Sequence, residues 1–280
     1  MTETMPETMP ETTPCLGVIP DLDEDLYHSD PDSISASGAK TLLRSPAHFL
    51  HERTHGRPGT KAMDLGTVAH ELILGTGRGY VAVEGNRNAK AVKEEIAKHE
   101  ADGKIVLKPD EVAAAERMAD AVLSHPDASR LLTTGRPEVS MFARDEGRST
   151  DRHPIIRRCR WDWINDTLGI GVDVKTTRNA ALDELPKHVL TYGYDLSAAW
   201  YLDIVADLAQ DLDAYALVCV ESAEPHPVVV AELSGEFLDR GKRLADKALD
   251  LYADCLAVGE WPGYLDAGYA TLEPPAWAKE

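Results

Sequence analysis

The sequence predicts an α/β fold in which a mixed central β-sheet is flanked by helices. The 280-residue chain has a hydrophobic content of 43%, which is ordinary for a globular protein and sufficient for one large domain. Strand-like segments, which alternate with a period of two or form short apolar runs, are interspersed with segments of helical periodicity. The five strand-like segments are residues 138–142, 156–164, 170–177, 214–220 and 228–233.

Helices are expected where apolar residues recur three and four positions apart. Ser35 is the expected cap of a first helix that ends at Ser45-Pro46, although it could instead contact DNA. Small residues in the helix at 60–74, such as Gly66, allow that helix to pack closely on a neighbour. The further expected helices begin at Pro46 and Lys108 or span residues 91–100, 194–208 and 237–258.

The two ends of the chain differ in composition from its centre. Residues 1–30 combine a Met-Pro-Glu-Thr repeat with an acid-rich run, so we expect a disordered N-terminal tail. Residues 31–265 are expected to form the domain. From Trp261-Pro262 onward the chain is expected to be extended and to pack through its aromatic residues, including Trp277, and residues 266–280 are expected to form the C-terminal tail.

The charge balance restricts the way in which this protein could bind nucleic acid. A net charge of −19, from 29 basic and 48 acidic residues, argues against a broad phosphate-binding surface. A local basic channel, or a ring of several copies with a basic bore, would remain compatible with this charge. The sequence has neither a signal peptide nor a membrane-spanning apolar run, so we expect a cytoplasmic protein.

A hairpin between residues 161 and 175 carries the strongest chemical signal. Turn-forming residues at 165–169 separate its two strands and bring Asp162 roughly opposite Asp173, near Lys175. Two close carboxylates repel each other, and a divalent cation relieves that repulsion. Hard oxygen ligands suit Mg²⁺ or Mn²⁺. An Asp and a Lys two positions apart also occur on ordinary solvated strands, so this triplet alone is a weak signal.

The spacing from Asp162 to the Asp173-Val174-Lys175 triplet resembles the PD-(D/E)XK nuclease superfamily. The motif Gly66-Thr67-x-x-His70 and the opening around Ile34 resemble its RecB-like and phage-encoded RecE-like (exodeoxyribonuclease VIII) branch. The resemblance implies a restriction-endonuclease-like fold. It also implies a magnesium-dependent exonuclease that degrades linear double-stranded DNA from an end and leaves a single-stranded tail for recombination.

The resemblance also implies a set of site residues. His70, Asp162, Asp173 and the backbone carbonyl of Val174 would hold the metal, and Lys175 would orient or deprotonate the attacking water. On the sequence alone, a buried structural histidine is a plain alternative for His70. The implied partner is a RecT-like single-strand annealing protein.

Several residues are secondary candidates. Glu138 lies where the superfamily often has a further acid, although an exposed glutamate at a sheet edge is the plain alternative. Ser197 replaces the Gln that the family usually has in this helix. Tyr201, four residues later, matches the family's Tyr, and it could either face the site or pack in the core. The expected DNA contacts are Arg158 and Arg160, which share the strand parity of Asp162, together with Lys40 and Arg44.

Other functions remain as alternatives at this stage. The chain could be a RecB-like repair nuclease of different polarity, an endonuclease, or a non-catalytic module of a DNA-processing assembly. The four cysteines are scattered singly and lack the closely spaced downstream group of iron–sulfur nucleases, so no such cluster is expected.

Overall fold

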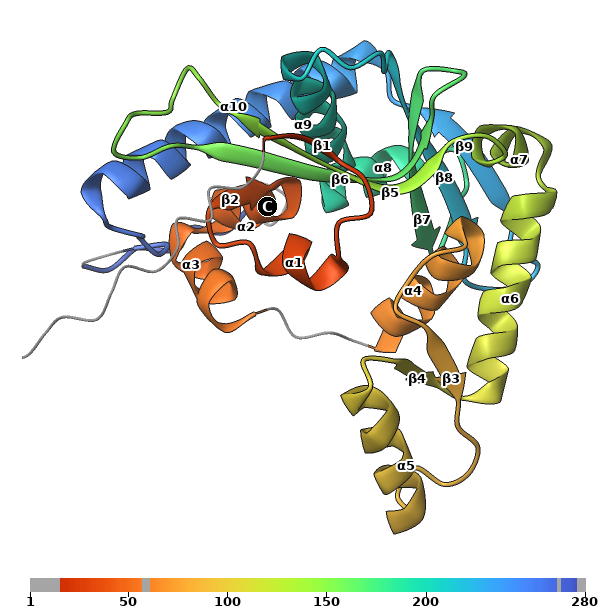
Figure 1. Cartoon of the computed structure of the whole chain (residues 1–280). Coiled ribbons are helices and arrows are strands. Elements are labelled where there is room, and N and C mark those ends of the chain that lie inside the picture. Colours follow the sequence, from red (N-terminus) through yellow and green to blue (C-terminus); the bar gives the residue numbers. More distant parts are fainter. Residues whose placement is uncertain (1–15, 57–60, 266–267, 276–280) are drawn as a thin grey trace, which may run out of the picture.

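The computed structural model describes residues 16–56, 61–265 and 268–275, and a mixed β-sheet lies at its centre (Figure 1). The sheet contains seven strands within these residues, in the order β1-β5-β6-β7-β8-β9, with β2 also paired to β6. The strands are β1 (Gly17–Ile19), β2 (Ser33–Ser35), β5 (Arg136–Arg144), β6 (Ile156–Asn165), β7 (Ile170–Thr177), β8 (Ala214–Glu221) and β9 (Val228–Glu232). All five expected strands are therefore confirmed.

The sheet is mixed because β7–β8 and β2–β6 are parallel, whereas the other neighbouring pairs are antiparallel. The turn between β6 and β7 forms as its residue types predict. Asn165 Oδ1 accepts a hydrogen bond from the N–H of Leu168 at 3.0 Å, and Gly169 adopts a left-handed φ of 64°. This tight turn fixes the register of the hairpin that carries Asp162 and Asp173.

Helices cover both faces of the sheet. One face packs against α2 (Ala36–Arg44), α9 (Tyr194–Asp207) and α10 (Gly235–Val258), around a core that includes Trp161 and Trp200. The other face packs against α4 (Lys61–Leu74), α6 (Pro109–Ser124) and α7 (Pro126–Leu132), around a core that includes Met118. Within the described residues, no helix is both long and apolar enough to cross a membrane.

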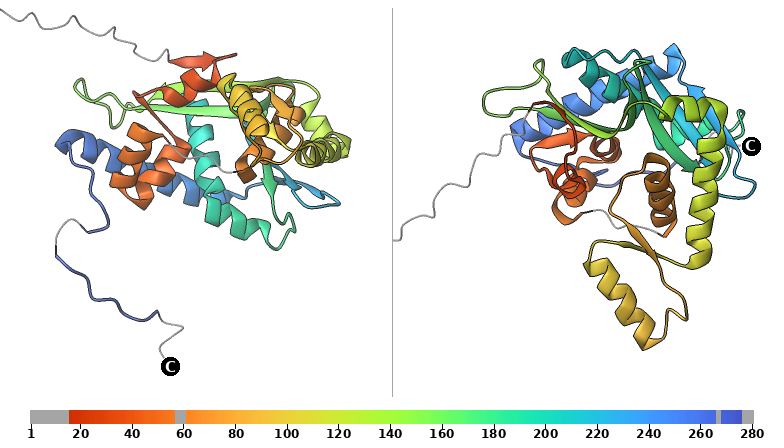
Figure 2. Two further views of the ribbon diagram at one scale, coloured as in Figure 1. Left: turned by 90° about the horizontal axis from the view of Figure 1, so that it is seen from below. Right: turned by 45° about the vertical axis from the view of Figure 1, so that its right-hand side comes forward.

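A small β–α–β unit projects from the body of the molecule (Figures 1 and 2). Its two parallel strands, β3 (Tyr80–Ala82) and β4 (Ile105–Leu107), flank the expected helix α5 (Lys90–Ala101). None of the residues of α5 is buried. The sequence did not predict β3 or β4, because three-residue strands offer too few positions for a period of two to be recognised. It also missed the short helices α7 and α8 (Leu185–Tyr192).

The N-terminal region is more ordered than its composition predicts. Residues 1–15 lie outside the described part of the chain, but β1 and helix α1 (Glu24–Ser29) fall within the segment that we expected to be disordered. Asp23 caps α1, because its carboxylate accepts from the N–H groups of Asp25 and Leu26. Tyr27 is buried against β5 and β6. The acid-rich run is thus a helix N-terminus, where negative charge is favourable.

The C-terminal segment packs by an aromatic ring, as expected, but over a shorter length. Trp261 stacks on Phe49 of α3 (Pro46–His55) with ring centroids 5.5 Å apart. The carbonyl of Pro262 accepts from the N–H of Ala47 at 3.1 Å. Farther along, Tyr269 is 93% exposed, and Trp277 lies outside the described residues.

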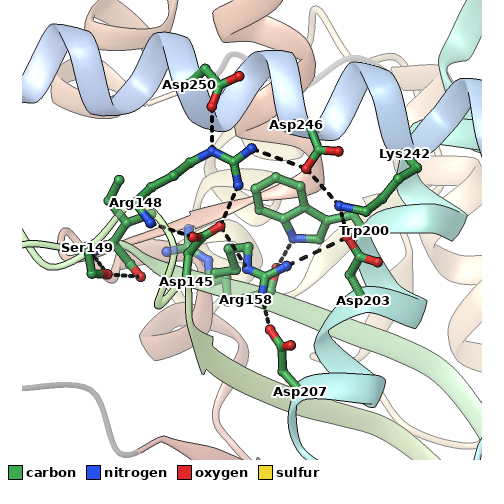
Figure 3. Close-up of polar contacts among 12 residues, drawn as sticks. Asp145, Arg148, Ser149, Arg158, Trp200, Asp203, Asp207, Lys242, Asp246 and Asp250 are labelled. Atoms are coloured by element: carbon green, nitrogen blue, oxygen red, sulfur yellow. Dashed lines mark hydrogen bonds and ion pairs between the residues drawn. The ribbon is translucent and has the colours of Figure 1, made fainter.

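A polar cluster ties α10 to the turn between β5 and β6 (Figure 3). Arg148 bonds to Asp145, Asp246 and Asp250. The neighbouring Arg157 pairs with Asp145 and with two aspartates of α9. Arg157 therefore points toward α9, away from the face that carries Arg158 and Arg160, as strand parity predicts.

Candidate active site

Three acidic residues lie at one level of the sheet, on the neighbouring strands β5, β6 and β7. The pairs Pro137↔Trp163 and Val139↔Trp161 flank Glu138 and Asp162, so these two acids face each other across β5 and β6. Trp163 pairs with Val172, which makes Asp162 and Asp173 the next positions of the hairpin. The predicted hairpin register is therefore the register of the structure.

The sheet is irregular at this level. The β5–β6 ladder skips the pair Glu138–Asp162, and Glu138 has a left-handed φ of 50°. Trp161 packs on the α9 side of the sheet, whereas Trp163 packs on the α4 side, although residues two apart on a strand normally share a face. Asp162 Oδ2 accepts from the N–H of Val174 at 2.7 Å. This local break allows the Glu138 and Asp162 side chains to approach α4.

Helix α4 presses closely on β7 and delivers a histidine to the two acids. A Cβ added at Gly66 would lie 2.8 Å from Thr176 Oγ1, so any larger residue would force Thr176 to move. His70, one turn later, places Nε2 3.1 Å from Asp162 Oδ2 and Nδ1 3.7 Å from Glu138 Oε1. The side chain of His70 is 25% exposed, so it is partly accessible and is not a fully buried core histidine.

His70, Glu138 and Asp162 form the group that could hold a metal ion among the described residues. One ligand atom from each lies within 4.8 Å of the others. This set differs from the expected one. Asp173 instead uses Oδ1 to accept from Lys175 Nζ at 2.5 Å and Oδ2 to accept from the Tyr215 hydroxyl at 2.6 Å. The carbonyl of Val174 also faces Lys175 Nζ, at 3.4 Å.

The acids of the site have divergent pKa values because their partners differ. Burial raises the pKa of Glu138 to about 7, and the Asp162 charge adds to this effect against the opposing influence of His70. Burial alone would raise the pKa of Asp162, but His70 and Lys175 hold it well below its usual range. Burial outweighs the neighbouring Lys175 charge and raises the pKa of Asp173. Asp162 is thus the firmly ionised acid.

The two bases of the site both hold their protons more tightly than usual. Burial opposes the charged form of Lys175, but Asp173 and Asp162 outweigh it and raise the lysine pKa. Burial likewise opposes protonation of His70, whereas Asp162 and Glu138 raise the pKa of the imidazole. Lys175 is therefore an ammonium group at neutral pH, which favours the orienting role over the role of a general base.

His70, Glu138 and Asp162 line a hollow of about 690 Å³, and Lys175 Nζ lies 4.0 Å from Asp162 Oδ2. One side of it carries His70, Glu138, Asp162 and Tyr201, whose ring packs edge-on against Trp161 at 5.0 Å. Tyr201 therefore lines the hollow and also packs against the core. The opposite side is the N-terminal segment, which contributes four acidic residues: Asp21, Asp23, Glu24 and Asp25.

The structure corrects the expected role of Arg158 and Arg160. Both are less than a tenth exposed. Arg158 Nη1 donates to the carbonyls of Asp30 and Ser33, and Arg160 donates to Ser140 Oγ and, at 2.6 Å, to the Leu22 carbonyl. Both guanidinium groups also lie over the Tyr27 ring. They hold the N-terminal segment in place, and Arg160, which also lines the hollow, is already bonded to Ser140 and Leu22.

Of the remaining candidates, Lys40 and Ser35 lie near the site, whereas Arg44 and Ser197 make contacts elsewhere. Lys40 donates to the Tyr192 carbonyl at 3.1 Å and lies 6.0 Å from the Tyr194 ring, which is also 5.8 Å from Lys175 Nζ. Arg44 is exposed and donates to the Tyr264 hydroxyl. Ser197 is buried in α9. Ser35 caps α2 through the N–H of Gly38, as preferred from the sequence, and also lines the hollow.

Sequence reasoning missed two residues of the site, Tyr194 and Tyr215. Tyr215 lies on β8, an otherwise apolar and buried strand, where its hydroxyl needs a partner. A tyrosine in such a strand could therefore have indicated, from the sequence, a buried hydrogen-bond partner for its hydroxyl. Tyr194 begins α9, and nothing in the local pattern distinguishes it from a packing residue.

Comparisons with known proteins address the family and the fold of the chain. Residues 35–271 match the family described as a PDDEXK-like domain of unknown function (DUF3799). A candidate exonuclease from Eubacterium rectale has a similar fold, with a TM-score of 0.61 and 12% identity over 91% of this chain and 96% of that one. A phage-related exonuclease from Haemophilus somnus aligns over 81% of this chain and 96% of its own, with 14% identity and a TM-score of only 0.35. A search of curated proteins finds no significant match.

Proposed function

Since the chain belongs to the PDDEXK-like family, we propose that it is a metal-dependent DNA nuclease that degrades linear duplex from an end. One observation carries the proposal. His70, Glu138 and Asp162 converge at the level of the sheet where Asp173 holds Lys175. Phosphodiester hydrolysis requires a nucleophile, neutralisation of phosphate charge and stabilisation of the leaving oxygen, and this arrangement offers groups for each task.

The three converging side chains fit a hard divalent cation. Two carboxylates and an imidazole are ligands that Mg²⁺ or Mn²⁺ accepts, and Asp162 remains ionised at neutral pH because its pKa is depressed. A bound cation of this kind supplies Lewis-acid chemistry at the phosphate and lowers the pKa of water. Asp173, whose two oxygens are held by Lys175 and Tyr215, lies at the same level of the sheet and completes the acidic surroundings.

Lys175 would act as a fixed positive charge. Its ammonium group lies 2.5 Å from Asp173 Oδ1 and 4.0 Å from Asp162 Oδ2, so it is positioned between the two acids. A protonated lysine there would donate to the scissile phosphate or to the attacking water, and it would not accept a proton. Tyr215, by donating to the second oxygen of Asp173, keeps that carboxylate oriented toward Lys175.

The exonucleolytic part of the proposal rests on two resemblances. The RecE-like resemblance of Gly66–His70 and the exonuclease name of the structurally similar protein both favour action at DNA ends. On this proposal, the product is a single-stranded tail, and a RecT-like annealing protein would bind it. A ring of several copies would give an acidic chain a concentrated basic bore.

The test is digestion of DNA labelled at either end, in parallel with closed circular duplex, with and without Mg²⁺. Loss of label from linear DNA alone supports an exonuclease, whereas cleavage of the circle indicates an endonuclease. Asp162→Asn and Lys175→Met are expected to abolish cutting, and only Asp162→Asn is expected to weaken Mn²⁺ binding measured by calorimetry. No Mg²⁺-dependent release of nucleotides from any DNA would refute the proposed function.

A further inference from the structure

The surroundings of Lys175 differ in charge and in residue type between the hollow and the start of α9. The lining of the hollow contains four acidic residues from Asp21 to Asp25, of which Glu24 pairs with Arg78. Outside the hollow, next to Lys175, lie the side chains of Lys40 and Tyr194 and the exposed Tyr192. Phosphate groups are repelled by the acidic residues and attracted by the two ammonium groups. A DNA strand that reaches Lys175 therefore has one electrostatically favourable direction in which to continue.

The favourable side is built around two stacked tyrosine rings. The Tyr192 and Tyr194 rings have centroids 5.6 Å apart and an interplanar angle of 30°. Tyr194 is flanked by two ammonium groups, because Lys175 Nζ lies 5.8 Å and Lys40 Nζ lies 6.0 Å from its centroid. Lys40 also donates to the carbonyl of Tyr192 at 3.1 Å, which fixes the end of α8 beside the site.

Tyr192 is the unusual member of this group. Its side chain is 54% exposed, although its ring lies in a row with Tyr194 and the edge of His188, whose centroid is 5.8 Å away. Exposed aromatic rings interleaved with cations are the pattern by which proteins bind unpaired nucleotides. A nucleobase that stacks on such a ring buries apolar surface that Tyr192 otherwise leaves in water.

We propose that Tyr192 is a stacking platform for an unpaired nucleobase of the strand being cut, next to the phosphate held at Lys175. Lys40 then binds a neighbouring phosphate of the same strand, and the acidic N-terminal segment keeps the strand from leaving on the opposite side. The base at this position is unpaired in this proposal, because a base inside a duplex has both of its faces covered by stacked neighbours. This inference rests on the proposed nuclease function and adds a binding site for a nucleobase to it.

The experiment measures the affinity of the full chain for tailed duplex DNA, with Ca²⁺ in place of Mg²⁺ to prevent cutting. Single abasic sites are moved one position at a time along the strand end. Stacking of one base on an aromatic ring corresponds to about a 5- to 150-fold change in affinity. Tyr192→Ala should weaken binding by a factor in this range, and Tyr192→Phe should retain binding. At one abasic position the wild type should lose a similar factor, and Tyr192→Ala should lose nothing further.

The controls separate this inference from the proposed function. Tyr269→Ala removes a tyrosine that is 93% exposed and should leave affinity unchanged. If Tyr192→Ala binds like wild type, or weakens binding equally at every abasic position, the stacking platform is refuted while the nuclease proposal stands. If the wild type neither binds nor cuts DNA, both proposals fail.

Discussion

Replacing Arg160 by Met is expected to destabilise the N-terminal segment without changing phosphate contacts. The substitution keeps a long side chain over Tyr27 but removes the guanidinium group. It deletes the hydrogen bonds to Ser140 Oγ at 2.9 Å and to the Leu22 carbonyl at 2.6 Å, and a cation–π contact at 4.4 Å. Hydrogen bonds from a charged donor and a desolvated cation–π contact together indicate a loss of about 2–4 kcal/mol.

Urea denaturation measures the loss in global stability, and hydrogen exchange over residues 22–29 measures local release of α1. Arg178→Met is the matched control, because Arg178 is exposed and makes no hydrogen bond or ion pair with the described residues. Arg178 lies directly after β7, three positions beyond Lys175. We therefore expect Arg178→Met to keep full stability and to weaken DNA binding. If Arg160 instead contacted a phosphate, the slope of log affinity against log salt would fall by about 0.9. Unchanged stability with a reduced slope for Arg160→Met would contradict the reasoning.

Three further outcomes are expected. Glu138→Gln should gain stability over wild type in metal-free buffer as pH rises from about 4.5 through 7, reaching at most about 3 kcal/mol, because the folded pKa of about 7 exceeds the unfolded one; equal pH profiles in urea titrations would argue against this. His70→Ala should lose Mn²⁺ affinity in calorimetry while its melting temperature changes little, because His70 is partly exposed. A large fall in melting temperature would instead indicate that His70 has a structural role in the core. Gly171→Ala should cost about 1–3 kcal/mol in urea titrations, because its Cβ would lie 2.1 Å from the Trp161 ring. Gly235→Ala, with open space around it, should cost much less.

The predictable part of the site is the part that follows from local pattern. The period of two and the turn residues determine the hairpin register, so the sequence alone places Asp162, Asp173 and Lys175 together. The helix motif that ends at His70 is recognised by resemblance. Glu138 is predicted only as a secondary ligand, because no local pattern reveals the left-handed backbone and the skipped ladder pair that turn it toward His70.

The parts that the sequence could not supply depend on distant partners. Strand parity correctly separated Arg157 from Arg158 and Arg160, but it could not show which atoms each guanidinium group meets. Their partners include backbone carbonyls of an acid-rich segment whose composition indicated disorder. A capping aspartate at position 23, a buried tyrosine at position 27 and these two arginines together order that segment, because β5 and β6 provide a surface for it.

The attachment of the N-terminal segment has a consequence for how the protein is made. The hydrogen bonds from Arg158 and Arg160 to residues 22–33 span between 125 and 138 positions of the chain. During synthesis, α1 leaves the ribosome long before its anchoring arginines exist, and a six-residue helix is not stable alone. The first segment to be translated is therefore among the last to dock, and contacts of such sequence separation slow folding. The side of the hollow that is lined by the N-terminal segment can therefore form only after β6 has been synthesised and paired.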